Sequence, residues 1–159
     1  MRYNMALQEE IKSGGCAAAT GPVSLGIKAG DFIYLSSQLP FDPKTKKIIS
    51  GDFKAQAERC LKNMDCLLQE LGLSSEYVLK TTVCLTDMDN YDILNEVYAK
   101  HFHKPYPART VMGVTSLPYH AQLSIEAYAV DTRALEVIIA SEETYSCRKE
   151  GCCSLEENE

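Results

Sequence analysis

The sequence of 159 residues lacks any apolar run that approaches the ~20 residues of a membrane-spanning helix. No apolar run follows the N-terminal residues 1–5, so no secretory signal and no membrane partner are expected. Clusters of Lys and Arg are also missing, and the formal net charge is −6. Because nonspecific nucleic-acid binding depends on clustered cations, the sequence argues against a nucleic-acid partner.

Several catalytic motifs are missing as well. The chain has no Gly-x-Ser-x-Gly elbow, no P-loop and no dinucleotide-binding glycine pattern. His101 and His103 have no third protein ligand near them in the sequence, so no metal site is predicted.

The chain has seven cysteines, an odd number. Four lie in the body of the chain, namely Cys16, Cys60, Cys66 and Cys84, and three lie near its end, namely Cys147, Cys152 and Cys153. We interpret the first four as free thiols that pack as small hydrophobes. The last three match neither a Cys-x-x-Cys pair nor a zinc spacing. Free thiols and the missing signal together favour a reducing compartment, and we expect a cytoplasmic protein.

Hydrophobic periodicity predicts one α/β (α+β) domain over residues 1–131. The first elements expected are a hairpin of residues 23–28 and 32–36 and a helix from Asp52 to Gly72. A strand over 78–85 follows, and then a helix that Asp89 or Asn90 caps and that runs to about His101. The last elements are a strand over 108–114 and a strand whose buried residues are Leu123, Ile125, Ala127 and Ala129. These elements predict a mixed sheet with two helices on one face. The other face needs cover, which oligomerisation would supply.

Residues 132–159 differ in composition from the rest of the chain. They hold three basic residues and seven Glu, together with the last three cysteines. We expect an acidic C-terminal extension that is flexible, in which residues 134–140 form either a strand or a helical turn.

Arg109 is the first candidate for a functional residue. It follows Pro105 and Pro107, which restrict the backbone and favour a stiff lead-in to a strand. A guanidinium held near the start of a strand is pre-oriented to bind a carboxylate or a phosphate. The competing interpretation is a surface or interface ion pair.

Glu126 is the second candidate, because it is the one carboxylate in the apolar strand 125–130. A carboxyl group in a partly apolar cleft can act as general acid and base. A simple hairpin through Leu117 and Pro118 would place Arg109 almost opposite Glu126. The competing interpretation of Glu126 is a solvent-facing residue of a half-buried strand.

An ordered set of short motifs resembles the RidA/YjgF family, the reactive-intermediate deaminases also described as L-PSP endoribonucleases. The motifs are Gly21-Pro22-Val23-Ser24, Leu35-Ser36-Ser37-Gln38-Leu39-Pro40, Gly51-Asp52, Lys80-Thr81-Thr82-Val83, Asn95-Glu96-Val97-Tyr98, Pro107-Ala108-Arg109 and Ile125-Glu126-Ala127. The resemblance covers roughly Cys16 to Val130. It implies a chorismate-mutase-like fold, a homotrimer with clefts between subunits, and hydrolysis of enamines or imines such as 2-aminoacrylate without metal or cofactor.

By position, the resemblance assigns Arg109 to the substrate carboxylate and Glu126 to water and proton transfer. It also places Ser36 in the pocket and Asn95 beside it. Three pocket positions depart from the family pattern: Val23 replaces a tyrosine, Ser37 a glycine, and Val111 a cysteine. A fourth departure is Tyr119-His120, where the family has Lys-Gly. These departures change the wall of the pocket more than its charged groups.

Three functions remain open from the sequence. The first is a trimeric enamine or imine deaminase with a shifted choice of substrate. The second is a ribonuclease, and the third is a non-catalytic ligand-binding or chaperone-like trimer that kept the anion site.

Overall fold

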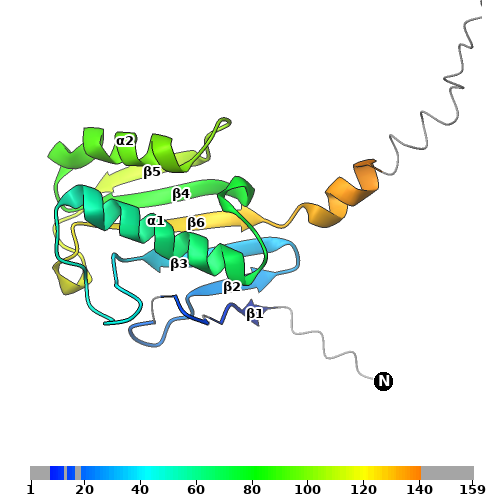
Figure 1. The fold of residues 1–159 in the computed structure, drawn as a ribbon, viewed down its shortest axis with the longest axis horizontal. Coiled ribbons are helices and arrows are strands. Elements are labelled where there is room, and N and C mark those ends of the chain that lie inside the picture. Colours follow the sequence, from blue (N-terminus) through cyan, green and yellow to red (C-terminus); the bar gives the residue numbers. More distant parts are fainter. Residues whose placement is uncertain (1–7, 13, 17–18, 141–159) are drawn as a thin grey trace, which may run out of the picture.

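The computed structural model describes residues 8–12, 14–16 and 19–140. Its strands are β1 (Glu9–Glu10), β2 (Gly26–Ala29), β3 (Phe32–Gln38), β4 (Val78–Leu85), β5 (Ala108–Gly113) and β6 (Leu123–Val130). Its two main helices are α1 (Phe53–Glu70) and α2 (Tyr91–His101). The strands form one mixed sheet in the order β1-β2-β3-β6-β4-β5, and both helices cover the same face (Figure 1). The predicted α+β architecture is confirmed.

The limits of α1 follow from local chemistry. The Asp52 side chain accepts a hydrogen bond from the Ala55 amide at 2.9 Å, which caps the first turn. Gly72 adopts a left-handed conformation with φ of 70°, as a C-terminal stop requires. Both predicted ends of this helix are confirmed.

The start of α2 differs from the prediction. A 3-10 turn over Met88–Asn90 precedes the helix, and Asp87 caps that turn by accepting a hydrogen bond from the Asp89 amide. Asn90 lies at the N-terminus of α2, but its side chain makes no capping hydrogen bond there.

The core lies between the sheet and the two helices. Ile125, Ala127 and Leu123 of β6 are fully buried there, as are Val83 and Leu85 of β4. The alternation of these residues with less buried ones agrees with the predicted buried face of the last strand.

The simple hairpin considered between β5 and β6 does not form. β5 pairs with β4 in parallel, and β4 pairs with β6 in antiparallel, so β4 lies between them. The pairing of β5 with β4 continues to the end of β4, where the amide of Val114, the residue after β5, donates a hydrogen bond to the Leu85 carbonyl. A local turn therefore links two strands that are not neighbours in the sheet.

The expectation that the body cysteines are free is wrong for two of the four. Cys16 and Cys66 form a disulfide that joins residues 50 positions apart. Cys60 is a free thiol buried in the core, where desolvation raises its pKa, and Cys84 is a free, half-buried thiol.

A helix over residues 133–140 follows β6 and lies away from the sheet (Figure 1). Its start is held by Asp131, which accepts hydrogen bonds from Arg133 and from Lys28. These bonds hold the pKa of Asp131 well below its usual range. Residues 141–159, including Cys147, Cys152 and Cys153, lie outside the described residues.

The turn Pro118–His120 contains backbone strain. His120 has a φ of 57° although it carries a side chain, and that side chain is exposed. A left-handed conformation costs a residue with a Cβ atom roughly 1–2 kcal/mol relative to glycine. His120→Gly should therefore raise the free energy of unfolding by about 1 kcal/mol, as measured by urea denaturation.

His120→Ala is the matched control for this prediction. It removes the imidazole but keeps the Cβ atom, so it should give no gain. Equal stabilisation by Ala and Gly would mean that the imidazole, and not the backbone, causes the effect.

Candidate active site

Arg109 lies at the second position of β5 and points towards α2. Its Nη2 donates a 2.6 Å hydrogen bond to Oδ1 of Asn95 and a longer one of 3.4 Å to the Tyr91 hydroxyl. The guanidinium carbon lies 4.6 Å from the centre of the Tyr98 ring, a cation–π contact. Three α2 side chains thus fix the orientation of the cation.

A cavity of about 280 Å³ adjoins this cation. We call it the Arg109 pocket, and it is lined by Asn95, Tyr98, Ala99, Tyr106, Pro107 and Arg109. Within the described part of the chain, Nε and Nη1 of Arg109 have no hydrogen-bond partner. This leaves donors for an external anion.

Tyr98 is itself held from below by β4. Its hydroxyl lies 2.9 Å from the hydroxyl of Thr81, which is fully buried. Burial raises the pKa of Tyr98, so the phenol stays neutral under Arg109. The contact between the Thr81 and Tyr98 hydroxyls therefore fixes the position of the Tyr98 ring, over which the Arg109 guanidinium lies.

Glu126 lies opposite a β-bulge of β3. Leu35 pairs with Ala127 and Gln38 pairs with Ile125, so β3 has one more residue than β6 across this stretch. A bulge bends its strand and re-aims the side chains beside it. Here it places Ser36 and Ser37 next to the Glu126 carboxylate.

A cavity of about 320 Å³ opens at this bulge. We call it the Glu126 pocket, and it is lined by residues 19–20, 23–25 and 36–39 with Phe41 and Glu126. The Ser36 hydroxyl donates to the Ser24 carbonyl at 2.6 Å, so it ties two parts of the wall together. The predicted residues Val23, Ser36 and Ser37 thus lie in the same pocket as Glu126.

Tyr128 contacts Glu126 from two positions along β6. Its hydroxyl donates to Oε1 of Glu126 at 3.4 Å, and the negative charge of Glu126 raises the pKa of Tyr128. The Tyr128 ring packs edge-on against Tyr34, with ring centres 5.5 Å apart.

The sheet register separates the two charged candidates. Arg109 pairs with Thr81, which pairs with Ala127 on the face under the helices, whereas Glu126 pairs with Thr82 on the opposite face. Successive side chains of a strand point to opposite faces. Arg109 and Glu126 of one chain therefore cannot contact the same small molecule.

The predicted site residues thus fall into two groups. Asn95 joins Arg109 in the Arg109 pocket, and the other group lines the Glu126 pocket. Val111 lines neither pocket and packs against the core. Sequence reasoning missed Tyr91 and Tyr98, although the spacing of Tyr91, Asn95 and Tyr98 along one helical face could have indicated them.

Residues 15–131 match the sequence profile of the family described as Endoribonuclease L-PSP. The chain belongs to the endoribonuclease L-PSP family. This is the RidA/YjgF family that the motifs predicted.

Named relatives of this family cover most of the chain. A RutC family protein of Pyrococcus horikoshii is 40% identical over 123 residues, 77% of this chain and 98% of the relative. The human 2-iminobutanoate/2-iminopropanoate deaminase is 33% identical over 124 residues, 78% of this chain and 90% of the relative. Reactive Intermediate Deaminase A, chloroplastic, of Arabidopsis thaliana is 38% identical over 122 residues, 77% of this chain and 65% of the relative.

A solved member of the family has the same fold. The crystal structure of RidA from the Antarctic bacterium Psychrobacter aligns with a TM-score of 0.74 and 37% identity, covering 77% of this chain and 98% of that chain. Among the residues that the structure describes, no group of three His, Cys, Asp or Glu could hold a metal ion. Within the same residues, no helix is long and apolar enough to cross a membrane.

The Thr81–Tyr98 pair supports a stability prediction. Thr81→Val and Tyr98→Phe each leave one buried hydroxyl without its partner, which should cost about 1–2 kcal/mol of unfolding free energy. The double variant should lose about 0.5–1.5 kcal/mol less than the sum, because neither hydroxyl then remains. Urea denaturation of the four proteins measures this coupling.

Thr82→Val is the matched control, because Thr82 neighbours Thr81 but points to the other face of the sheet. It should change stability by less than about 0.5 kcal/mol. Additive losses in the Thr81 and Tyr98 variants would contradict the hydroxyl contact.

Proposed function

We propose that this chain is a deaminase that hydrolyses reactive enamines and imines, such as 2-aminoacrylate or related 2-imino acids, without metal or cofactor. The observation that carries the proposal is Arg109, a cation oriented by Asn95 and Tyr98 that lines an open pocket and has two donor groups without a partner among the described residues. A carboxylate accepts two parallel bonds from such a fork. The deaminase names of two relatives support the same reaction.

The complete site belongs between subunits of a homotrimer. Arg109 of one chain and the Glu126 group of the next would form one cleft, because the two groups of a single chain point to opposite faces of its sheet. The face away from the helices exposes Phe32, Tyr34 and Tyr128, apolar surface that a second chain would cover. The predicted trimer is consistent with both observations.

In this cleft the reaction needs only positioning and proton transfer. Arg109 fixes the substrate carboxylate, and Glu126 gives a proton to the enamine carbon to form the imine. Glu126 then takes a proton from water, whose oxygen attacks the imine carbon, and the proton passes to the nitrogen. The carbinolamine then loses its hydroxyl proton to Glu126 as the carbon–nitrogen bond breaks, which releases a carbonyl compound and ammonia and restores the acid form of Glu126.

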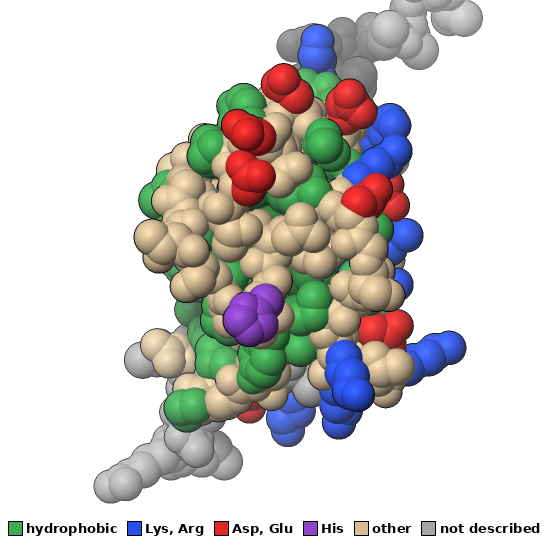
Figure 2. Space-filling view, turned by 90° about the vertical axis from the view of Figure 1, so that its left-hand side faces the viewer, with side chains coloured by type: hydrophobic (Ala, Val, Ile, Leu, Met, Phe, Trp, Pro, Cys, Tyr) green, Lys and Arg blue, Asp and Glu red, His purple; other side chains and the backbone are tan. Residues whose placement is uncertain are grey.

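Surface charge supports the deaminase over the ribonuclease. The face drawn in Figure 2 carries Asp and Glu in its upper part, a His near its lower middle and hydrophobic and uncharged side chains between them, and Lys and Arg lie towards its right and lower margins. Strong RNA binding needs a basic groove with aromatic side chains on which bases stack. The non-catalytic alternative differs from the deaminase only in turnover, so the assay below decides between them.

The inter-subunit site makes a sharp prediction about mixed trimers. Arg109→Ala and Glu126→Gln should each lower kcat/KM for 2-aminoacrylate or branched imino acids by about 10²–10³-fold. The two inactive variants, unfolded and refolded together, should regain activity, since every mixed trimer has one cleft with an intact Arg109 and an intact Glu126. Such a trimer should show about one third of the activity of the unmutated protein.

The assay generates 2-aminoacrylate with a dehydratase or branched imino acids with an amino-acid oxidase, and it follows the loss of the intermediate. Each variant refolded alone is the control and should stay inactive. Activity of the unmutated protein without recovery in the mixture would place both groups in one chain, while an inactive but well-folded unmutated trimer would leave the ligand-binding alternative.

Tyr128 takes over a role that Val23 cannot perform. Where the family has a tyrosine, Val23 has no hydroxyl, and Tyr128 brings a phenol to Glu126 from the same strand. We expect Tyr128→Phe to lower kcat about 10-fold with little change in KM, because it loses a hydrogen bond to the acid and not a contact to the carboxylate.

Tyr34→Phe is the matched control, since it keeps the packed ring pair and does not touch Glu126. It should leave kcat within about twofold of the unmutated value. Equal losses in both variants would show that the loss does not come from the hydrogen bond between Tyr128 and Glu126.

A further inference from the structure

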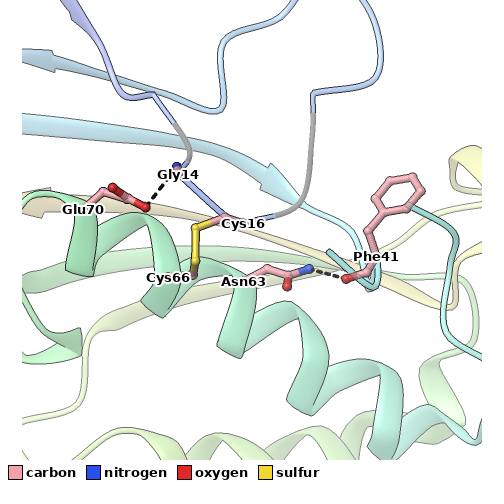
Figure 3. The surroundings of a disulfide bond; sticks show 6 residues. All are labelled: Gly14, Cys16, Phe41, Asn63, Cys66 and Glu70. Atoms are coloured by element: carbon pink, nitrogen blue, oxygen red, sulfur yellow. Dashed lines mark hydrogen bonds between the residues drawn. A yellow bond between two sulfur atoms is a disulfide. The ribbon is translucent and has the colours of Figure 1, made fainter. Parts of the chain in front are cut away.

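Side chains on one side of α1 hold two segments of the Glu126 pocket in place. We call the segment with Leu39 and Phe41 the first wall and the segment 19–25 the second wall. Asn63, Cys66 and Glu70 follow one another at spacings of three and four residues, so they lie on the same side of the helix (Figure 3). Each of them is attached to a segment that leads into the pocket or lines it.

Asn63 holds the first wall through its amide. Its Nδ2 donates to the carbonyls of Leu39 at 2.9 Å and of Phe41 at 3.0 Å, and both of these residues line the Glu126 pocket. Asn63 is almost fully buried, so water does not compete for these bonds.

Cys66 and Glu70 hold the lead-in to the second wall. Cys66 forms the disulfide with Cys16, and Glu70 accepts a hydrogen bond from the Gly14 amide at 3.0 Å (Figure 3). Ala19, the first residue of this wall, is three positions after Cys16. Three residues span at most about 11 Å, so the position of Cys16 restricts the position of Ala19.

The second wall has few other attachments. Its far end is tied by Ser24 and Leu25, which accept hydrogen bonds from Ser36. Among the described residues from Ala19 to Val23, the structure gives one hydrogen bond, from the Val23 amide to the Gly21 carbonyl, which is internal to the segment. A segment with so few contacts depends on the anchors at its two ends.

We propose that the Cys16–Cys66 disulfide is a redox-controlled clip that sets the position of the 19–25 wall of the Glu126 pocket. The bond is cleavable, whereas the Asn63 bonds to the opposite wall are not. Reduction therefore loosens one wall of the pocket and leaves the other in place.

The reductant is a dithiol. Its thiolate attacks one sulfur of the pair, and Cys66 is the more exposed target because Cys16 is only 8% exposed. The first step forms a mixed disulfide and releases the other protein cysteine, which takes up a proton. The second thiol of the reductant then resolves the mixed disulfide, so two protein thiols form and the dithiol is oxidised to its disulfide.

Hydrogen–deuterium exchange of the full chain tests the clip without reference to catalysis. The protein is compared in its oxidised form and after reduction with dithiothreitol, and Cys66→Ala is compared in the same way. The informative amides are those of Gly14, which donates to Glu70, and of Ser36, which donates to the Leu25 carbonyl. We expect exchange of these two amides to rise about tenfold on reduction, because loosening of the clip breaks their hydrogen bonds. The wall held by Asn63 should not change, and Cys66→Ala should match the reduced protein in both redox conditions.

Cys84→Ser is the matched control, because it removes a free thiol outside the clip and should respond to the reductant as the unmutated protein does. Unchanged exchange of the Gly14 and Ser36 amides, an equal rise in the wall held by Asn63, or alkylation of both Cys16 and Cys66 in protein prepared without reductant would each overturn the proposal. If Cys66→Ala does not fold, the reduced unmutated protein gives the answer.

The catalytic consequence of the clip rests on the proposed function. Reduction should raise KM for the imine about tenfold and leave kcat within about twofold, because the wall shapes the pocket but does not contact the reacting atoms. If neither form hydrolyses any imine, the proposed function fails, and the exchange experiment still decides whether the clip exists.

Discussion

The pairing of β6 with β4 is the constraint on which the rest of the structure depends. It extends from Val78 opposite Ala129 to Leu85 opposite Leu123, and it joins two inner strands of the sheet. Because side chains alternate along each strand, this single register sends Ala127 to the core and Glu126 to the open face. It also forces β5, with Arg109, to the outer edge of the sheet. The separation of the two charged groups is therefore a property of the fold and not of any loop.

The sequence predicted the elements whose signals are local. Asp52 and Gly72 mark the ends of α1, and the alternation in β6 identified its buried face. It did not predict the parallel pairing of β5 with β4, because the nearest turn residues suggested a hairpin and a parallel crossover has no local signal. The Cys16–Cys66 bond was missed for a related reason, since the two residues meet only after α1 packs beside the N-terminal segment.

The candidate site shows the same division. Family motifs pointed to Arg109, Asn95 and Glu126, whose positions in the fold place them beside pockets. Periodicity and motifs alone did not indicate that Tyr98 lies under the guanidinium or that a bulge opens the pocket at Glu126. Both features depend on contacts between distant segments, namely α2 with β4 and β3 with β6. The roles of these residues in catalysis remain predictions.

Helix α1 performs two tasks on two sides. Its core side buries Ala57, Met64 and Leu68 against the sheet, and its flank holds pocket segments through Asn63 and Cys66. Substitutions on the flank can therefore change the shape of a pocket while the packing that stabilises the domain stays intact. Such a separation lets a small domain acquire new ligand preferences by single changes on a helix that never touches the ligand.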